Sequence, residues 1–258
     1  MSWSGRTAER APRAAVAVRG AALLDVRQLT KTFGPLTVLR EVSLQVGHGE
    51  IVAVAGGNGA GKSTLLRAIA GFLPPASGSI VLGDSDIAGL PPHRHVEHGI
   101  ALLPQGRSTF PELTVAENIE LGGWTLRSDR ERLRAAVEAM FARYPHLREL
   151  RERPAGSLSG GQQRAVEIAR LVVCDPKVLL IDEPSVGLSP IIAAQVYREL
   201  EALKAEGRTI LLVDQDVRAA IKIADYVYVL NSGKNDIEGD RSAFEGDLGV
   251  MVRRWLGV

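Results

Sequence analysis

The nine residues G-G-N-G-A-G-K-S-T at positions 56–64 constrain this chain more than any other feature. They follow an apolar run at residues 51–55 and precede a helix-like segment at residues 65–70. A strand, a glycine-rich loop and a helix in this order, with Lys62 and Ser63 closing the loop, are typical of a site for the phosphates of a nucleoside triphosphate. The candidate phosphate-binding residues are Gly56, Gly57, Asn58, Gly59, Ala60, Gly61, Lys62, Ser63 and Thr64.

Each residue type in this loop has a physical task. Glycine permits positive φ angles and a close backbone approach, so that consecutive N–H groups and the start of the helix face the anion. Lys62 is expected to reach the β- and γ-phosphates, and Ser63 to offer its hydroxyl to Mg²⁺. The loop therefore predicts a nucleoside triphosphate with Mg²⁺. A glycine-rich turn with a surface lysine is the alternative interpretation of the same residues.

Composition narrows the class of partner. Lys and Arg number 31 and Asp and Glu 30 in 258 residues, a formal net charge of +1, which gives no bulk attraction to nucleic acid or anionic lipid. No apolar run approaches the roughly 18 to 20 residues that a membrane-spanning helix needs. The single cysteine excludes an internal disulfide. We expect a cytosolic protein with no nucleic-acid partner that does not itself cross a bilayer.

The order of apolar segments indicates an α/β fold. Strand-like segments lie on both sides of the glycine-rich loop, and strands alternate with helix-like segments again in the C-terminal half. This alternation predicts a parallel core that is interrupted by a helical insertion. The expected strands outside the loop unit are residues 23–29, 38–46, 78–82, 178–181, 209–213 and 226–230.

The interrupting segment shows helical signals. Thr114-x-x-Glu117 and Ser128-x-x-Glu131 both have the spacing of a capping box, which predicts a helix start at each. The second predicted helix carries one apolar stripe that we interpret as a packing face. The stripe consists of Leu133, Val137, Phe141 and Tyr144.

A second motif is the apolar run at residues 178–181 followed by Asp182 and Glu183. Loops at the carboxyl ends of buried parallel strands are where such folds bind ligands. Asp182 is expected to hold Mg²⁺, directly or through water, and Glu183 to polarise an attacking water as general base. Alone, such a run is often only the end of a strand, but beside the loop at residues 56–64 it predicts a site for hydrolysis.

The third motif, L-S-G-G-Q at residues 158–162, stands before a helical run at residues 164–173. Ser159 and Gln162 form a further capping box, and a helix start with a hydroxyl favours an anion. With these three motifs, the chain resembles the nucleotide-binding subunits of ATP-binding cassette (ABC) transporters over roughly residues 22–239. The resemblance implies that the γ-phosphate of an ATP held by the other subunit of a head-to-tail dimer is bound by Ser159, Gly160, Gly161 and Gln162.

The resemblance also implies an architecture. We expect an α/β phosphate-loop NTPase core with a parallel sheet, an antiparallel N-terminal β-subdomain and a helical subdomain inserted at about residues 84–160. The ABC ATPase domain then spans residues 21–258. Residues 1–20 hold four arginines among small residues without the apolar core of a secretory signal, and we interpret them as a flexible tail.

Other positions match the family in order. Phe33 lies where its members carry an aromatic residue that stacks on adenine, a core phenylalanine being the alternative. Gln105 lies at the family's glutamine that contacts Mg²⁺ or the attacking water and links the site to the membrane partner. Residues 185–190 match the dimer-contact loop, and Ser189 and Pro190 also suit the start of the next helix.

One position departs from the family. Most cassette ATPases place a histidine against the γ-phosphate where this chain has Gln215, which can donate a hydrogen bond but cannot carry imidazolium charge. We expect slower hydrolysis at this subunit's own site, with Glu183 still present. Together with residues 104–118, the substitution resembles one of the two ATPase subunits of branched-chain amino-acid uptake systems and their amide and urea relatives.

The implied function is that of the ATP-hydrolysing, energy-coupling subunit of an importer for branched-chain amino acids, with amide or urea import as the alternative. The implied partners are transmembrane permease subunits, a second ATPase subunit that is identical or different, and indirectly a periplasmic or extracellular solute-binding protein. The chain is then cytoplasmic and peripheral on the inner face of the cell membrane. Residues 105–122 carry the implied permease contact, and Phe110, Leu113 and Trp124 are either exposed there or part of the core.

Three rival functions fit parts of the pattern. A soluble cassette ATPase acting on DNA or ribosomes usually carries a long coiled-coil insertion or a second cassette, and this sequence has neither. A phosphate-loop kinase needs an acceptor site and does not need the L-S-G-G-Q motif. A non-catalytic regulatory cassette stays open because of Gln215, and only a hydrolysis assay separates it from an active one.

Overall fold

The computed structural model describes residues 22–245, so the tail predicted at residues 1–20 lies outside the described residues. The described residues form two sheets. In chain order their strands are β1 (Ala22–Phe33), β2 (Leu36–Gly47), β3 (Ile51–Gly56), β4 (Ser77–Leu82), β5 (Ser85–Asp86), β6 (Ile100–Leu103), β7 (Val178–Asp182), β8 (Thr209–Val213), β9 (Tyr226–Asn231) and β10 (Lys234–Asp240). One sheet has the order β2-β1-β4-β5 and the other the order β10-β9-β3-β8-β7-β6.

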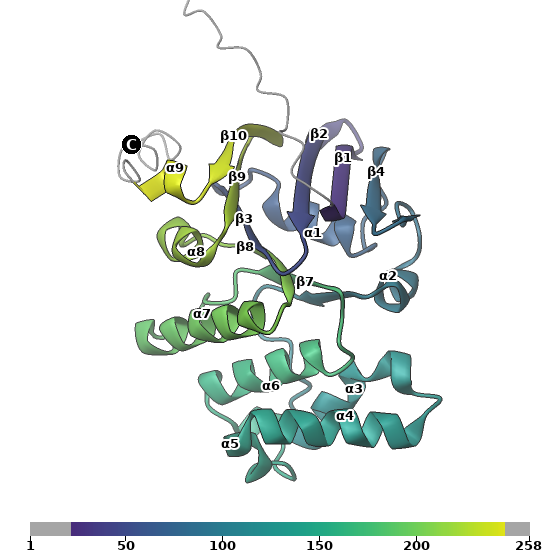
Figure 1. The fold of residues 1–258 in the computed structure, drawn as a ribbon, viewed down its shortest axis with the longest axis vertical. Helices are drawn as coiled ribbons and strands as arrows, with labels where there is room; N and C mark the ends of the chain where they lie inside the picture. The colour runs from purple at the N-terminus through teal and green to yellow at the C-terminus, as the bar shows by residue number, and fades with distance from the viewer. Residues whose placement is uncertain (1–21, 246–258) are drawn as a thin grey trace, which may run out of the picture.

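Helices surround these sheets. They are α1 (Lys62–Ile69), α2 (Pro92–His98), α3 (Val115–Gly122), α4 (Arg130–Arg143), α5 (Pro145–Arg148), α6 (Gly160–Val172), α7 (Pro190–Ala205), α8 (Val217–Ile223) and α9 (Ser242–Glu245), with the 3₁₀ turns η1 (Trp124–Leu126) and η2 (Ala155–Ser157). Figure 1 shows α3 to α6 gathered at one end of the molecule and the antiparallel strands β1, β2 and β4 at the other. Within residues 22–245, no helix combines the length and apolar character that crossing a membrane requires.

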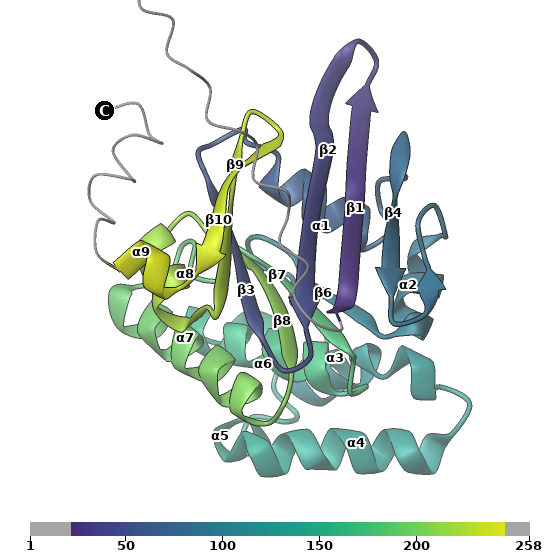
Figure 2. The ribbon, with the colours of Figure 1, turned by 45° about the horizontal axis from the view of Figure 1, so that its top comes forward.

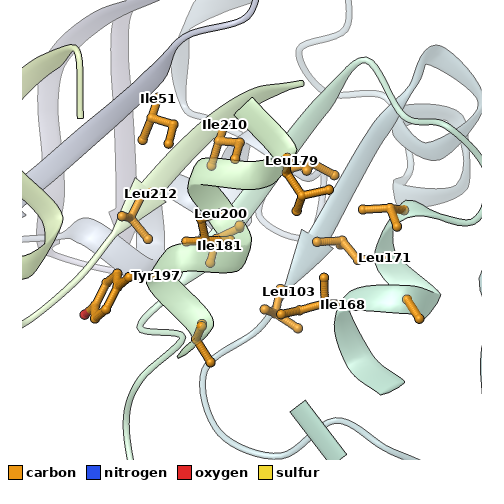
Figure 3. Close-up of a cluster of buried hydrophobic side chains, with 14 of the residues drawn as sticks. Ile51, Leu103, Ile168, Leu171, Leu179, Ile181, Tyr197, Leu200, Ile210 and Leu212 are labelled. Atoms are coloured by element: carbon orange, nitrogen blue, oxygen red, sulfur yellow. The ribbon is translucent and has the colours of Figure 1, made fainter. Parts of the chain in front are cut away.

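The six-stranded sheet is parallel from β9 to β6, and only β10 runs antiparallel to its neighbour β9. Successive residues of a strand point to opposite faces, so a strand that is apolar throughout fills a core on each side. Figure 3 shows Leu179 and Ile181 of β7 facing Leu200 of α7 and Ile168 of α6. The residue between the first two, Leu180, belongs to the core on the opposite face.

Helix α1 packs on that opposite face, where Leu65 and Leu66 are fully buried. The antiparallel sheet closes the same core through side chains such as Leu24 and Ile80, and Figure 2 shows β1, β2 and β4 beside α1. The predicted α/β class, with a parallel core sheet and an antiparallel N-terminal sheet, is confirmed.

Of the two helix starts predicted in the interrupting segment, the structure confirms one and contradicts the other. Thr114 Oγ1 accepts the N–H of Glu117 at 3.1 Å, and Glu117 Oε2 accepts the N–H of Thr114 at 2.8 Å, which confirms the first capping box. The box predicted at Ser128 is wrong, because α4 is capped by Asp129, whose Oδ1 accepts the N–H of Arg132 at 3.0 Å. Aspartate caps as well as serine does, and it stands one residue closer to the helix.

The segment at residues 84–160 holds helices α2 to α5 together with β6, a strand of the six-stranded sheet. The apolar stripe of α4 points inward and joins the same core as α6 and α7. Its members, all buried as predicted, are Leu133, Val137, Phe141 and Tyr144.

Gly233, in the turn between β9 and β10, ties the N-terminal sheet to the glycine-rich loop. Its N–H donates to the carbonyl of Ala60 at 3.1 Å, and its carbonyl accepts the N–H of Arg40 at 2.7 Å. It has φ +77°, and a Cβ there would lie 1.9 Å from the carbonyl oxygen of Val38. Only glycine fits this junction.

We expect Gly233→Ala to destabilise the chain more than Gly83→Ala does. Gly83 also has a positive φ, +59°, but a Cβ there meets no atom within 4 Å. The backbone strain alone costs about 1–2 kcal/mol in both variants, and the clash in Gly233→Ala adds about 1–3 kcal/mol. Urea unfolding of the two variants measures the difference. Equal losses of stability would contradict the clash.

Candidate functional site

The glycine-rich loop connects β3 to α1 and fixes the backbone that the sequence predicts around phosphate. A Cβ at Gly56 would lie 2.4 Å from the carbonyl oxygen of Leu230, so the loop packs directly on β9. Gly61 caps α1 with φ +100°. On the other side, a Cβ at Gly57 or Gly59 would meet no atom within 4 Å. The backbone is thus supported from one side and open on the other, as an anion cradle requires.

Lys62 begins α1 and is only 5% exposed. Its ammonium group donates to the carbonyls of Gly56 at 2.9 Å and Gly57 at 3.1 Å, so the cation is held over the loop that precedes it. Burial lowers the pKa of Lys62, and nearby carboxylates, Glu183 foremost, oppose this change. The loop therefore presents one buried positive charge at the point where phosphate is predicted to bind.

Ser63 and Asp182 lie side by side although they come from different elements. Ser63 is in the first turn of α1, Asp182 ends β7, and the serine hydroxyl donates to Asp182 Oδ1 at 3.2 Å. Burial raises the pKa of Asp182, the hydrogen bond from Ser63 opposes the rise, and the charge of Glu183 adds to it. A hydroxyl and a carboxylate with this spacing are oxygen donors of the kind that Mg²⁺ prefers.

Glu183 and Gln105 form the second pair of the site. Glu183 directly follows β7 and is 4% exposed, with its N–H donating to the carbonyl of Val213 at 2.8 Å. Its φ of +46° is uncommon for a residue with a side chain and marks local strain of the kind found at functional sites. Gln105, just after β6, donates from Nε2 to Glu183 Oε2 at 2.5 Å. The structure thus places the predicted base against the predicted sensing glutamine.

Phe33 and Gln215 both lie on the surface. Phe33 ends β1 with 45% of its surface exposed, which rules out a core phenylalanine. The ammonium group of Lys31 lies 5.2 Å from the centroid of its ring. Gln215 is exposed in the short connection between β8 and α8. Stacking on adenine by Phe33 and contact with phosphate by Gln215 stay predictions.

The segment Ser159 to Gln162, called the signature segment below, starts α6 with a reciprocal cap. Ser159 Oγ accepts the N–H of Gln162 at 3.4 Å, and Gln162 Oε1 accepts the N–H of Ser159 at 3.0 Å, as the sequence predicts. Helix α6 packs on the face of the six-stranded sheet opposite to α1. The structure therefore does not bring the signature segment together with the glycine-rich loop of the same chain.

Sequence reasoning missed Asp214, which follows β8 as Asp182 follows β7. Asp214 is 1% exposed and accepts the hydroxyl of Tyr197 at 2.8 Å and the N–H of Asp216 at 2.9 Å. Burial raises its pKa, and these hydrogen bonds oppose the rise. The sequence signal for Asp214 is a carboxylate directly after an apolar strand. Asp214 is the third acidic group near Lys62.

Comparisons with known proteins identify the relatives of this chain. The family described as ABC transporter matches residues 39–186. The high-affinity branched-chain amino acid transport ATP-binding protein BraG of Pseudomonas aeruginosa is 40% identical over 212 residues, 82% of this chain and 90% of BraG. The lipopolysaccharide export system ATP-binding protein LptB of Escherichia coli is 36% identical over 214 residues, 82% of this chain and 88% of LptB.

Among solved structures, an ATP-binding cassette of an ABC transporter in its ADP conformation aligns with a TM-score of 0.79 and 30% identity. The alignment covers 90% of this chain and 97% of that one. The match therefore includes both the core sheet and the helices between β6 and β7.

We expect Asp182→Asn to weaken ATP binding about tenfold or more when Mg²⁺ is present, because the carboxylate that is predicted to hold the cation loses its charge. In EDTA the same variant should bind ATP no more weakly than the native chain, since a negative charge near the phosphates has been removed. Calorimetric titration with a non-hydrolysable ATP analogue measures both conditions. Asp214→Asn is the matched control, a buried carboxylate nearby that lacks the Ser63 contact. Equal losses with and without Mg²⁺ would refute a metal role for Asp182.

Proposed function

The chain belongs to the ABC transporter family and is an ATPase, and on this premise we propose that it is the energy-coupling subunit of an importer for branched-chain amino acids. The observation that carries this proposal is the 40% identity to BraG, which extends over 90% of that protein's length. The departure at Gln215 supports the same subfamily. Import of amides or urea by a relative of such a system is the alternative within this class.

A second candidate follows from the 36% identity to LptB, whose name places it in lipopolysaccharide export. Uptake assays separate the candidates. The chain, reconstituted in lipid vesicles with the permease subunits that co-purify with it, should drive ATP-dependent accumulation of leucine, isoleucine or valine. Accumulation of urea or short amides instead would identify the related solute class, and ATP-dependent removal of lipopolysaccharide from the vesicles would identify an exporter.

The proposed mechanism uses the two side-chain pairs of the site. Ser63 and Asp182 would hold Mg²⁺, which would supply positive charge to the phosphates of ATP. Lys62 turns from the loop carbonyls to the β- and γ-phosphates. Glu183 accepts a proton from the attacking water, and Gln105 orients that water through its amide. No covalent intermediate with the protein is needed, because positioning and charge stabilisation account for this kind of catalysis.

Gln215 is proposed to act at the γ-phosphate from the turn after β8. Its amide can donate one hydrogen bond there, but it supplies no positive charge at neutral pH. Slower turnover than in a cassette with histidine is the expected consequence. Because Glu183 and Asp182 are both in place, we assign the chain an active site and not a purely regulatory one.

Two subunits are proposed to complete each ATP site. The signature segment lies across the sheet from the glycine-rich loop of its own chain, so it is free to bind the γ-phosphate on a second subunit. Leu188 and Ile192 lie beside Gly160 and Gly161 of this segment. Their neighbours Val186 and Ile191 expose 39% and 72% of their surface and fit a subunit contact. The partner is a second copy or a related ATPase subunit. Phe33 would stack on the adenine held by its own chain.

The permease is proposed to bind a groove of about 810 Å³ between α2, β6, α3 and α6. Phe72, Phe110 and Trp124 line it with 57%, 51% and 53% of their surfaces exposed, and Leu121 is 49% exposed. Residues 104 and 108 also line it, so the groove borders the loop that follows Gln105. The helical subdomain that the sequence predicts at about residues 84–160 would carry most of this surface. Docking there would hold the chain on the inner face of the membrane without a spanning helix among residues 22–245.

We expect Glu183→Gln to lower the rate of ATP hydrolysis by the reconstituted complex about 10²–10⁴-fold, the usual contribution of a general base. ATP affinity should stay within about threefold, because the amide keeps the size of the side chain. Glu201→Gln, on the exposed side of α7, is the control. Unchanged turnover in Glu183→Gln would show that hydrolysis occurs at a partner's site and that this chain only binds nucleotide.

Trp124→Asp combined with Phe110→Asp should release the chain from permease-containing vesicles, because two charges would face an apolar partner. Leu36→Asp is the control, since Leu36 is 60% exposed and begins β2, a strand that Figure 1 shows at the opposite end of the molecule from α3 and α4. Vesicle flotation followed by quantification of bound protein measures the effect. The double variant should retain ATP binding. Flotation equal to that of the native chain would place the permease contact elsewhere.

A further inference from the structure

The loop that follows Gln105 is fastened to α6 by buried charged side chains. Three residues of α6, spaced by three, face it: Arg164, Glu167 and Arg170. Glu167 and the Arg164 side chain are only 2% and 4% exposed. We call these three residues the loop anchor. Charged side chains are rarely buried to this extent without a specific set of partners.

Glu167 is the centre of the loop anchor. Its Oε1 accepts the backbone N–H of Ser108 at 2.5 Å and that of Thr109 at 3.0 Å. Its Oε2 lies 2.8 Å from Nη1 of Arg164. One carboxylate therefore binds two consecutive N–H groups of the loop and a guanidinium group of the helix at the same time. Hydrogen bonds to an ionised acceptor are the stronger kind.

The two arginines bind the carbonyl side of the same loop. Arg164 donates from Nη2 to the carbonyl of Gly106 at 3.2 Å. Arg170 donates from Nη2 to the carbonyl of Ser108 at 2.7 Å and to its hydroxyl at 2.8 Å, and its guanidinium group lies 5.3 Å from the ring centroid of Phe110. Residues 106–109 are thus held to α6 through both donors and acceptors of their backbone.

The charges of the loop anchor depend on one another. Burial lowers the pKa of both arginines, and the Glu167 carboxylate opposes this in each case. A neutral residue at position 167 would leave two buried cations without a counter-charge and two loop N–H groups with a weaker acceptor. Substitution at Glu167 should therefore shift the loop more than substitution of an exposed ion pair would.

We propose that Glu167 is a positioning residue for ATP hydrolysis, which holds residues 106–109 on α6 and thereby fixes the Gln105 amide against Glu183. Gln105 immediately precedes the anchored residues, and its hydrogen bond to Glu183 spans only 2.5 Å, so a small displacement of the loop breaks it. The inference rests on the proposed roles of Gln105 and Glu183 in hydrolysis. Glu167 itself touches neither of them.

The test is a double-mutant cycle in the reconstituted complex, with Glu167→Gln, Gln105→Ala and both together. We expect Glu167→Gln to lower kcat about tenfold while the KM for ATP stays within about twofold. In the Gln105→Ala background the same change should lower kcat less than about twofold, because the residue through which Glu167 acts is gone. Glu167→Asp, which keeps the charge, should recover part of the kcat lost in Glu167→Gln.

Glu199→Gln is the matched control. Glu199 is also a partly buried carboxylate paired with an arginine, since its Oε1 lies 2.8 Å from Nη2 of Arg143, but it joins α4 to α7 and not to the loop. It should leave kcat unchanged. Additive losses of kcat in the cycle, an unchanged kcat in Glu167→Gln or an unchanged kcat in Gln105→Ala would each overturn the positioning role.

A measurement on the native chain covers the case in which Glu167→Gln fails to fold. The amides of Ser108 and Thr109 should exchange with solvent as slowly as those in the middle of α6, because a buried carboxylate binds them. Rapid exchange at both would overturn the proposal. Failure of the proposed function gives a different result. In that case Glu183→Gln would leave hydrolysis unchanged, whether or not the loop is held on α6.

Discussion

Burial of the six-stranded sheet on both faces is the constraint on which the rest of the structure depends. Strands that are apolar throughout can be covered only if other elements pack on each side. Connections that cross over the sheet from the end of one strand to the start of the next leave these strands parallel. Their carboxyl ends then meet at one edge. The glycine-rich loop after β3, Asp182 and Glu183 at β7 and Asp214 after β8 all lie at this edge because of that packing. The positions of the site residues therefore follow from the way in which the sheet is covered on both faces.

The acidic groups and Lys62 at this edge of the sheet have charges that suit a nucleotide bound together with a divalent cation. Asp182 and Asp214 are carboxylates whose pKa burial raises, Glu183 adds a third acidic group, and Lys62 is the ammonium group that faces them. The single ammonium group of Lys62 cannot pair equally well with the carboxylates and with the phosphates of a nucleotide. A divalent cation held by Ser63 and Asp182, as proposed, would resolve this competition, since it would give the carboxylate a counter-charge and free the lysine for the anion.

Sequence predicted the parts of the site whose chemistry is local. The loop at residues 56–64 spans nine consecutive residues and the Ser159 cap joins residues three positions apart, so local spacing alone identifies both. The contact between Gln105 and Glu183 joins residues 78 positions apart, and no pattern in either segment encodes that distance. The loop anchor has a local signal, three charged residues spaced by three on α6, but its partners at residues 106–109 lie about 60 positions away in the sequence. Ser128 and Glu131 have the spacing of a capping box, but aspartate caps helices as well as serine does, so the local sequence does not decide between Ser128 and Asp129.

The placement of the glycine-rich loop and the signature segment on opposite faces of the sheet has a kinetic consequence. In the proposed pairing, a site split between two chains works only while they are together, so in dilute solution the specific activity rises with the concentration of the protein itself. The proposed binding to a permease would replace that dependence with an effective local concentration, which for short tethers reaches the millimolar range. A chain that has left the membrane would then consume almost no ATP, without any dedicated inhibitor.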